Sequence, residues 1–71
     1  MVMTFGQRIH ERLGALDAAG TTYQVSFEDG FPVDVISHSP HVLGVRHENS
    51  PVTRIVYVNL ATVREIEVIE L

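Results

Sequence analysis

The stretch YQVSFEDGFPVDV, residues 23–35, carries the clearest strand and turn pattern of this chain. Tyr23, Val25 and Phe27 alternate with polar residues, which is the period of a half-buried strand. An Asp-Gly dipeptide follows at positions 29–30, a pair typical of tight hairpin turns, and the apolar alternation resumes after it. We therefore expect two antiparallel strands joined by this turn, at about 21–28 and 31–37.

Three further strands are expected downstream of this hairpin. Small polar residues and prolines interrupt the apolar pattern at 37–40 and again at 49–51, and such residues favour turns. A shorter break, Leu-Ala-Thr, stands at 60–62. The apolar segments between these breaks predict strands at about 41–48, 52–59 and 63–71.

Upstream of the hairpin, residues 4–19 predict one amphipathic helix. Thr4 with Gln7 three positions later is a capping-box pattern, and Gly20 is well placed for a left-handed helix end. The apolar residues recur at helical spacing. They are Phe5, Ile9, Leu13 and Leu16.

A helix followed by five short strands predicts a single, mainly β domain over residues 1–71. We expect the strands, at about 21–70, to form a strongly bent antiparallel sheet that makes a small, partly open barrel. A flat sheet with the helix across one face is the alternative built from the same elements. Barrel closure is favoured because an open five-stranded sheet leaves two edges to protect.

Composition restricts the class of protein further. The chain has 71 residues, 45% of them hydrophobic, and no cysteine, which excludes disulfides and thiolate zinc sites. The apolar runs are too short to span a bilayer, so we expect a cytoplasmic domain with no membrane segment. A chain this short buries a limited core and often gains stability from self-association.

The charge pattern disfavours generic binding to a nucleic-acid backbone. The five basic residues are all arginines and are scattered, against nine carboxylates and a net charge of −4. Non-specific binding of DNA or RNA needs several cations on one face. We therefore expect no DNA partner and an acidic, solvated surface.

The fourth expected strand is apolar on both faces, where a surface strand of a small monomer has one polar face. The same pattern recurs near the C-terminus. In so short a chain the simplest partner for such strands is a second copy, so these residues are the expected oligomer interface. The alternative is that the helix covers the second face. The interface residues are Ile55, Val56, Val58, Val68 and Ile69.

A helix and five strands, with Val-x-Phe-x-Asp-Gly-x-x-Val at 25–33, resemble the Sm-like family, which includes the bacterial Hfq proteins. The late segment 55–63 is similar to the second motif of that family. Tyr57 matches the tyrosine of its Tyr-Lys-His stretch, while Val58 and Asn59 stand in place of the lysine and the histidine. The resemblance covers about residues 4–70.

The resemblance implies a hexameric or heptameric ring in which the fourth strand pairs with the fifth strand of the next subunit. It also implies RNA binding at the pore, through the loops after the second and fourth strands. Tyr57 and Phe31 are aromatic residues that could stack on bases. The RNA-binding residues expected on this basis are Tyr57, Asn59, Arg54, His38 and His41.

Other chemistry receives little support from the sequence. His38, His41 and His47 match no metal-binding spacing, so we expect no metal and no cofactor. No nucleophile elbow or phosphate-binding glycine loop is present, so we expect no enzyme activity. The competing function is a protein-interaction or scaffold module of the same fold, which the acidic charge and the missing lysine of the second motif favour.

Overall fold

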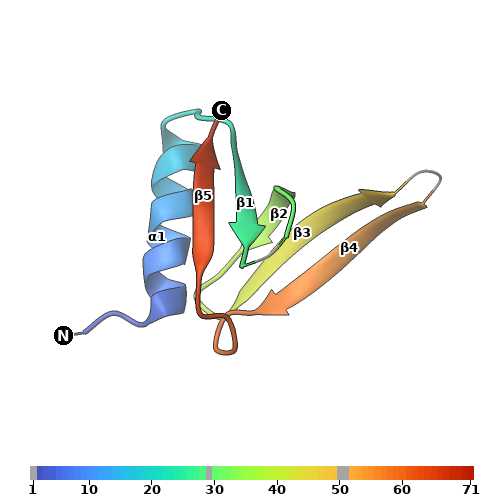
Figure 1. Cartoon of the computed structure of the whole chain (residues 1–71). Coiled ribbons are helices and arrows are strands. Elements are labelled where there is room, and N and C mark those ends of the chain that lie inside the picture. Colours follow the sequence, from blue (N-terminus) through green and yellow to red (C-terminus); the bar gives the residue numbers. More distant parts are fainter. Residues whose placement is uncertain (1, 29, 50–51) are drawn as a thin grey trace.

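The computed structural model describes residues 2–28, 30–49 and 52–71. These residues form a mainly β domain with one N-terminal helix, as the sequence predicts, and its strands pair in antiparallel fashion (Figure 1). The elements in chain order are α1 (Phe5–Ala18), β1 (Tyr23–Phe27), β2 (Asp34–His38), β3 (Val42–Asn49), β4 (Val52–Asn59) and β5 (Ile66–Glu70).

Both ends of α1 are fixed by the residues that predicted them. The Gln7 amide donates to the Thr4 hydroxyl at 3.1 Å, and the Thr4 amide donates to the Gln7 side chain at 2.8 Å, which completes the capping box. At the other end, Gly20 has a φ of +70°. The Thr21 amide reaches back to the Leu16 carbonyl at 3.0 Å, the pattern of a Schellman end.

The strands form two sheets rather than one closed barrel. β1 pairs with β5, and β2, β3 and β4 form a separate three-stranded sheet. A single antiparallel bridge between Val25 and Val33 joins the two sheets, with amide–carbonyl distances of 3.0 and 2.8 Å. The strands thus follow the spatial order β5-β1-β2-β3-β4, and in the described part of the chain β4 and β5 do not pair.

Two strands begin later than the sequence pattern predicts. β2 begins at Asp34 rather than at 31, because Pro32 has no amide to donate to a strand ladder. β5 begins at Ile66 rather than at 63, because the chain first turns after β4, where the Thr62 amide donates to the Asn59 carbonyl at 3.2 Å. At the first hairpin the Gly30 amide donates to Phe27, and Asp29 lies outside the described residues.

The core lies between α1 and the strands of both sheets. The expected helix stripe supplies three buried side chains, while Phe5 is half-buried at its edge. Neighbouring strands and the turn after β4 supply the others, so one apolar cluster holds all the elements together. The buried hydrophobic residues are Ile9, Leu13, Leu16, Val25, Val33, Leu43, Val45 and Leu60.

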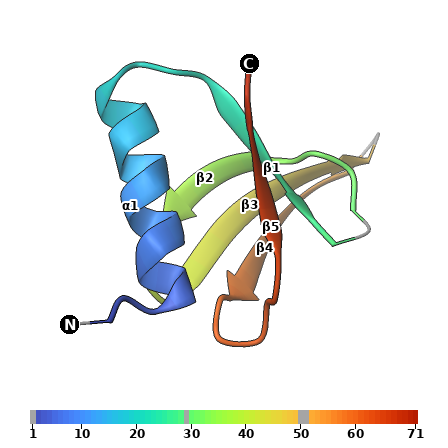
Figure 2. The same cartoon turned by 60° about the vertical axis from the view of Figure 1, so that its left-hand side comes forward.

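The hairpin of β3 and β4 extends away from α1 in both views (Figure 1, Figure 2), and the domain measures 45 × 28 × 18 Å. Every residue of β4 from 52 to 57 is exposed, so α1 does not cover this strand. Among them, Ile55 and Tyr57 are 43% and 70% exposed. None of the described helices is long and apolar enough to cross a bilayer.

Gly6 of α1 packs directly on the β2–β3 loop, and a Cβ there would collide with the Pro40 carbonyl oxygen. We expect Gly6→Ala to destabilise the protein by about 1–3 kcal/mol, because an added methyl overpacks this contact. Gly14 is the matched control on the same helix, since a Cβ there would meet only His38 Cε1 at 4.0 Å. Gly14→Ala should stabilise the protein by about 0.5–1 kcal/mol. Urea unfolding followed by circular dichroism measures both values, and equal effects of the two substitutions would contradict this packing.

Candidate functional site

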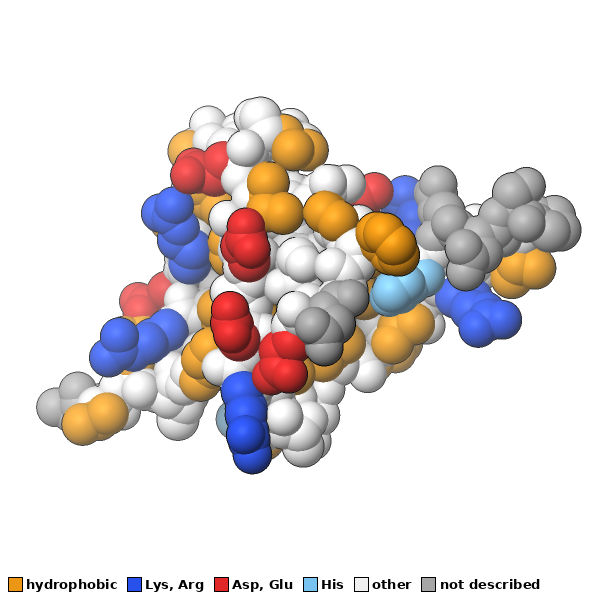
Figure 3. Space-filling model, viewed as in Figure 1, with side chains coloured by type: hydrophobic (Ala, Val, Ile, Leu, Met, Phe, Trp, Pro, Cys, Tyr) orange, Lys and Arg blue, Asp and Glu red, His pale blue; other side chains and the backbone are white. Residues whose placement is uncertain are grey.

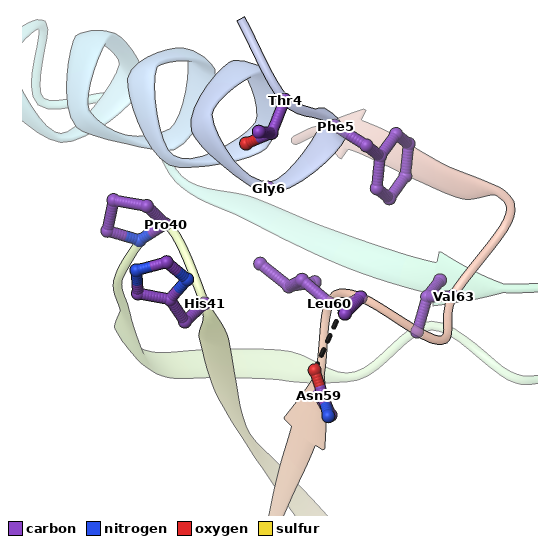
Figure 4. A pocket seen from close by; sticks show the side chains of 9 residues that line it. Thr4, Phe5, Gly6, Pro40, His41, Asn59, Leu60 and Val63 are labelled. Atoms are coloured by element: carbon purple, nitrogen blue, oxygen red, sulfur yellow. Dashed lines mark hydrogen bonds between the residues drawn. The ribbon is translucent and has the colours of Figure 1, made fainter.

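A pocket of about 330 Å³ lies at the N-terminal end of α1 (Figure 4). The first helical turn forms one side of it, the β2–β3 loop a second, and the segment after β4 the third. Three segments far apart in the sequence therefore meet at one concave surface. The lining residues are Thr4, Phe5, Gly6, Pro40, His41, Asn59, Leu60, Ala61 and Val63.

Short-range hydrogen bonds shape the two loops of this pocket. The Ser39 hydroxyl accepts from the Val42 amide at 3.0 Å, which folds the β2–β3 loop around Pro40 and His41. The Asn59 side-chain oxygen accepts from the Ala61 amide at 2.9 Å and so shapes the turn after β4 (Figure 4). Serine and asparagine favour turns because their side chains bond nearby backbone groups in this way.

The two loops are also bonded to each other. The Leu60 amide donates to the His41 carbonyl at 2.9 Å, which continues the β3–β4 ladder by one residue pair. The buried side chain of Leu60 anchors the turn in the core. The backbone therefore holds residues His41 and Asn59 close together at the end of this ladder.

The pocket is lined by uncharged and histidine side chains. The Asn59 oxygen is engaged by the Ala61 amide, and its NH₂ group points away from the other lining side chains (Figure 4). His41 adds an imidazole on an exposed loop residue. Such a lining suits the polar edge of a planar, neutral group better than it suits a phosphate.

The structure brings together some of the predicted RNA-binding residues and separates others. His41 and Asn59 both line the pocket. Tyr57 lies on the same face of β4 as Asn59, two residues away, because side chains alternate along a strand. Arg54 lies on the opposite face of β4, about 17 Å from Asn59 along the strand at ~3.3 Å per residue. It is not part of the pocket.

His38 does not line the pocket but faces α1 and belongs to a different cluster. Its Nε2 lies 2.8 Å from an Asp17 carboxylate oxygen, and its Nδ1 lies 2.7 Å from Nδ1 of His10. The Tyr23 hydroxyl donates to the other Asp17 oxygen at 3.0 Å. This cluster, which we call the histidine–carboxylate cluster, consists of His10, Asp17, Tyr23 and His38.

The cluster shifts the ionisation of two of its members. Hydrogen bonds, first from His38 and then from Tyr23, lower the pKa of Asp17. Burial, followed by the hydrogen bond to Asp17 and its negative charge, raises the pKa of Tyr23 to about 12. The carboxylate and the neutral phenol are thus the forms that the fold favours.

The three histidines considered as metal ligands lie in separate places. His38 contacts α1, His41 lines the pocket, and His47 lies on β3 beside a second hollow that contains Phe31. Within residues 2–28, 30–49 and 52–71, no group of three or more histidine or acidic side chains could hold a metal ion.

The sequence did not reveal the histidine–carboxylate cluster. His10 and Asp17 lie off the apolar stripe of the helix. The only signal was their spacing of seven residues, which places both on one face of the helix. Their partner on β2 depends on how the helix docks, which the local sequence does not determine.

Comparison of the chain with protein-family models, with curated proteins and with solved structures found no match.

Removal of the Tyr23 hydroxyl should change the alkaline stability of the protein. Between pH 10 and about 12 the phenol ionises in the unfolded chain but stays protonated in the fold, so stability is lost as the pH rises through this window. Tyr23→Phe should lower stability at neutral pH by about 1 kcal/mol, through the lost hydrogen bond, and reduce the further loss above pH 10.

Unfolding by urea at a series of alkaline pH values measures this effect. Tyr57→Phe is the control, since the Tyr57 ring is 70% exposed and its hydroxyl has no partner in the hydrogen bonds of the described residues. An equal loss of stability above pH 10 in wild type and Tyr23→Phe would contradict the raised pKa of Tyr23, which burial and the bond to Asp17 cause.

Proposed function

We propose that this chain is an Sm-like domain that assembles into a homo-oligomeric ring and binds RNA at the pocket formed by its two loops. The exposure of β4 is the observation that supports this assembly. This strand is outermost in the strand order, and apolar side chains are exposed along it. Four of them are Val52, Ile55, Val56 and Tyr57, at 38–70% exposure. An exposed apolar edge strand of this kind can pair with a strand of another chain.

The backbone of β4 supports pairing at its open edge. The Leu60 amide points to β3, where it meets the His41 carbonyl, and amide directions alternate along an antiparallel strand. The amides of Ile55 and Tyr57 therefore point away from β3. They are donors that a strand of another subunit would satisfy.

The open edge of β5 offers the complementary partner. The Leu71 amide donates to the Thr22 carbonyl at 2.9 Å, on the β1 side, so the amides of Val68 and Glu70 point outward. Val68 and Ile69 are half-buried and supply apolar contacts beside this edge. Because β4 and β5 are different surfaces, their pairing is head-to-tail, and such contacts close into a ring when the rotation permits.

The RNA-binding part of the proposal rests on the pocket. The pocket is lined by His41 from the β2–β3 loop and by Asn59 from the end of β4, and Tyr57 is two residues before Asn59 on the same strand face. Neutral donors and an aromatic ring suit base edges and base faces. A ring would repeat this pocket around its axis, so that several weak sites act on one strand of RNA.

A scaffold that binds protein is the second candidate function. Acidic side chains are visible on the face of the molecule seen in Figure 3. Glu65, just before β5, and Glu67 on β5 are exposed, while Glu70 pairs with Arg12 at 3.3 Å. Among the described residues, no arginine lines the pocket. This charge pattern favours a basic protein partner over a polyanion.

Proline at the open edge of β4 tests the assembly. Ile55→Pro removes an outward amide but no hydrogen bond to β3, so each subunit should still fold while the oligomer dissociates to monomers. Ile55→Thr is the matched control, because it keeps the amide and a β-branched side chain and should remain oligomeric. Light scattering gives the mass of each, and an Ile55→Pro chain of unchanged mass would contradict pairing at this edge.

Substitutions in the pocket test RNA binding. Asn59→Ala and His41→Ala should each weaken the binding of a short, mixed-sequence, fluorescent RNA by about 5–10-fold, the effect of one lost hydrogen bond. His47→Ala, on an exposed β3 residue outside the pocket, should leave the affinity unchanged. Fluorescence anisotropy measures all three. An oligomer that binds no RNA would contradict this function and favour the scaffold.

A further inference from the structure

The histidine–carboxylate cluster connects three elements of the fold and has no role in the proposed function. His10 and Asp17 come from α1, Tyr23 from β1 and His38 from β2. The His38 side chain is only 14% exposed. Its contact with His10 joins residues 28 positions apart, so it fixes how the helix docks on the end of β2.

The geometry of this cluster determines which ring nitrogens carry protons. A carboxylate only accepts hydrogen bonds, so the contact with Asp17 requires a proton on His38 Nε2. In neutral His38 the Nδ1 atom is then an acceptor, and His10 Nδ1 must donate to it across 2.7 Å. The two rings therefore share one proton in a direct Nδ1–H···Nδ1 hydrogen bond.

One additional proton fits this arrangement, whereas two do not. A single positive charge on the pair keeps one donor and one acceptor in the contact, and the Asp17 carboxylate compensates it. When both rings are charged, each Nδ1 carries a proton. Two N–H groups then face each other with no acceptor between them, and like charges lie in direct contact.

We propose that the His10–His38 pair is a proton-sensitive clamp, which holds α1 against the end of β2 and opens when both rings are protonated. The clamp acts next to the β2–β3 loop, because His38 precedes Ser39 and Pro40 in the chain. The helix contacts the same loop at a second point, where Gly6 packs on the Pro40 carbonyl. Opening the clamp loosens the first of these two contacts.

Among the charged groups around the clamp, Asp17 bonds directly to His38, and Asp34 and Arg46 line the hollow beside Asp17. From β1, Tyr23 reaches the pair only through its hydrogen bond to Asp17. On α1, Arg12 points to Glu70 of β5 at 3.3 Å, away from the pair. On β2, Asp34 accepts from Gln24 instead. One carboxylate balances one positive charge, which leaves the second charge uncompensated.

The direction of the pH effect follows from proton counting. In the unfolded chain both histidines take up protons independently as the pH falls below neutrality. Double protonation sets two N–H groups against each other in the fold but not in the unfolded chain, so it favours unfolding at acidic pH. Each proton of difference raises the unfolding constant about tenfold per pH unit. The clamp lies within one subunit, so it depends neither on a ring nor on RNA.

Unfolding at a series of pH values tests the clamp. Between pH 7 and about pH 5, the unfolding constant of the wild type should rise at least about tenfold more than that of His10→Gln, whose side chain does not titrate. His47→Gln is the matched control, since His47 is exposed on β3 and should keep the wild-type pH dependence. All samples are compared at one protein concentration, since assembly also affects stability. Equal pH dependence of wild type and His10→Gln would overturn the proposal.

A spectroscopic measurement on the unmodified chain makes the test independent of how well the variant folds. ¹⁵N-edited NMR reports which ring nitrogens carry protons. At neutral pH we expect His38 protonated at Nε2 and one proton shared between the two Nδ1 atoms. At acidic pH, protonation of all four ring nitrogens should coincide with loss of the cross-peaks between His10 and His38. Four protonated nitrogens with these cross-peaks intact would refute the clamp.

Discussion

The single bridge between Val25 and Val33 is the constraint on which the rest of the structure depends. Its two backbone hydrogen bonds are the only strand pairing between the two sheets in the described residues, and both side chains lie in the core. The three apolar residues of α1 pack into the same cluster. A chain of this length has one core, so the bridge, the helix and both sheets are stabilised together.

The bridge also determines which strands remain open. Because it joins β1 to β2, it places β5 and β4 at the two ends of the strand order. The same arrangement brings the β2–β3 loop and the turn after β4 together at the start of α1, where the pocket lies. The proposed assembly and the proposed binding site are thus consequences of one topology.

Local sequence patterns predicted much of this fold. The capping box at Thr4, the helix end at Gly20 and the bounds of β4 depend on neighbouring residues, and they lie where the sequence placed them. Barrel closure was a prediction about long-range pairing, and the sheets instead meet at one bridge. For the same reason the sequence did not reveal that His38 contacts His10 or that Arg54 lies outside the pocket.

In the proposed ring, the open edges of β4 and β5 pair between subunits. The most direct measurement is the molar mass of the unmodified chain in solution, by light scattering over a series of dilutions. We expect one closed species, a hexamer or heptamer of the 7.9 kDa chain, whose mass does not grow with concentration. A monomer at all concentrations would contradict it, because the exposed edge of β4 would then have no partner strand.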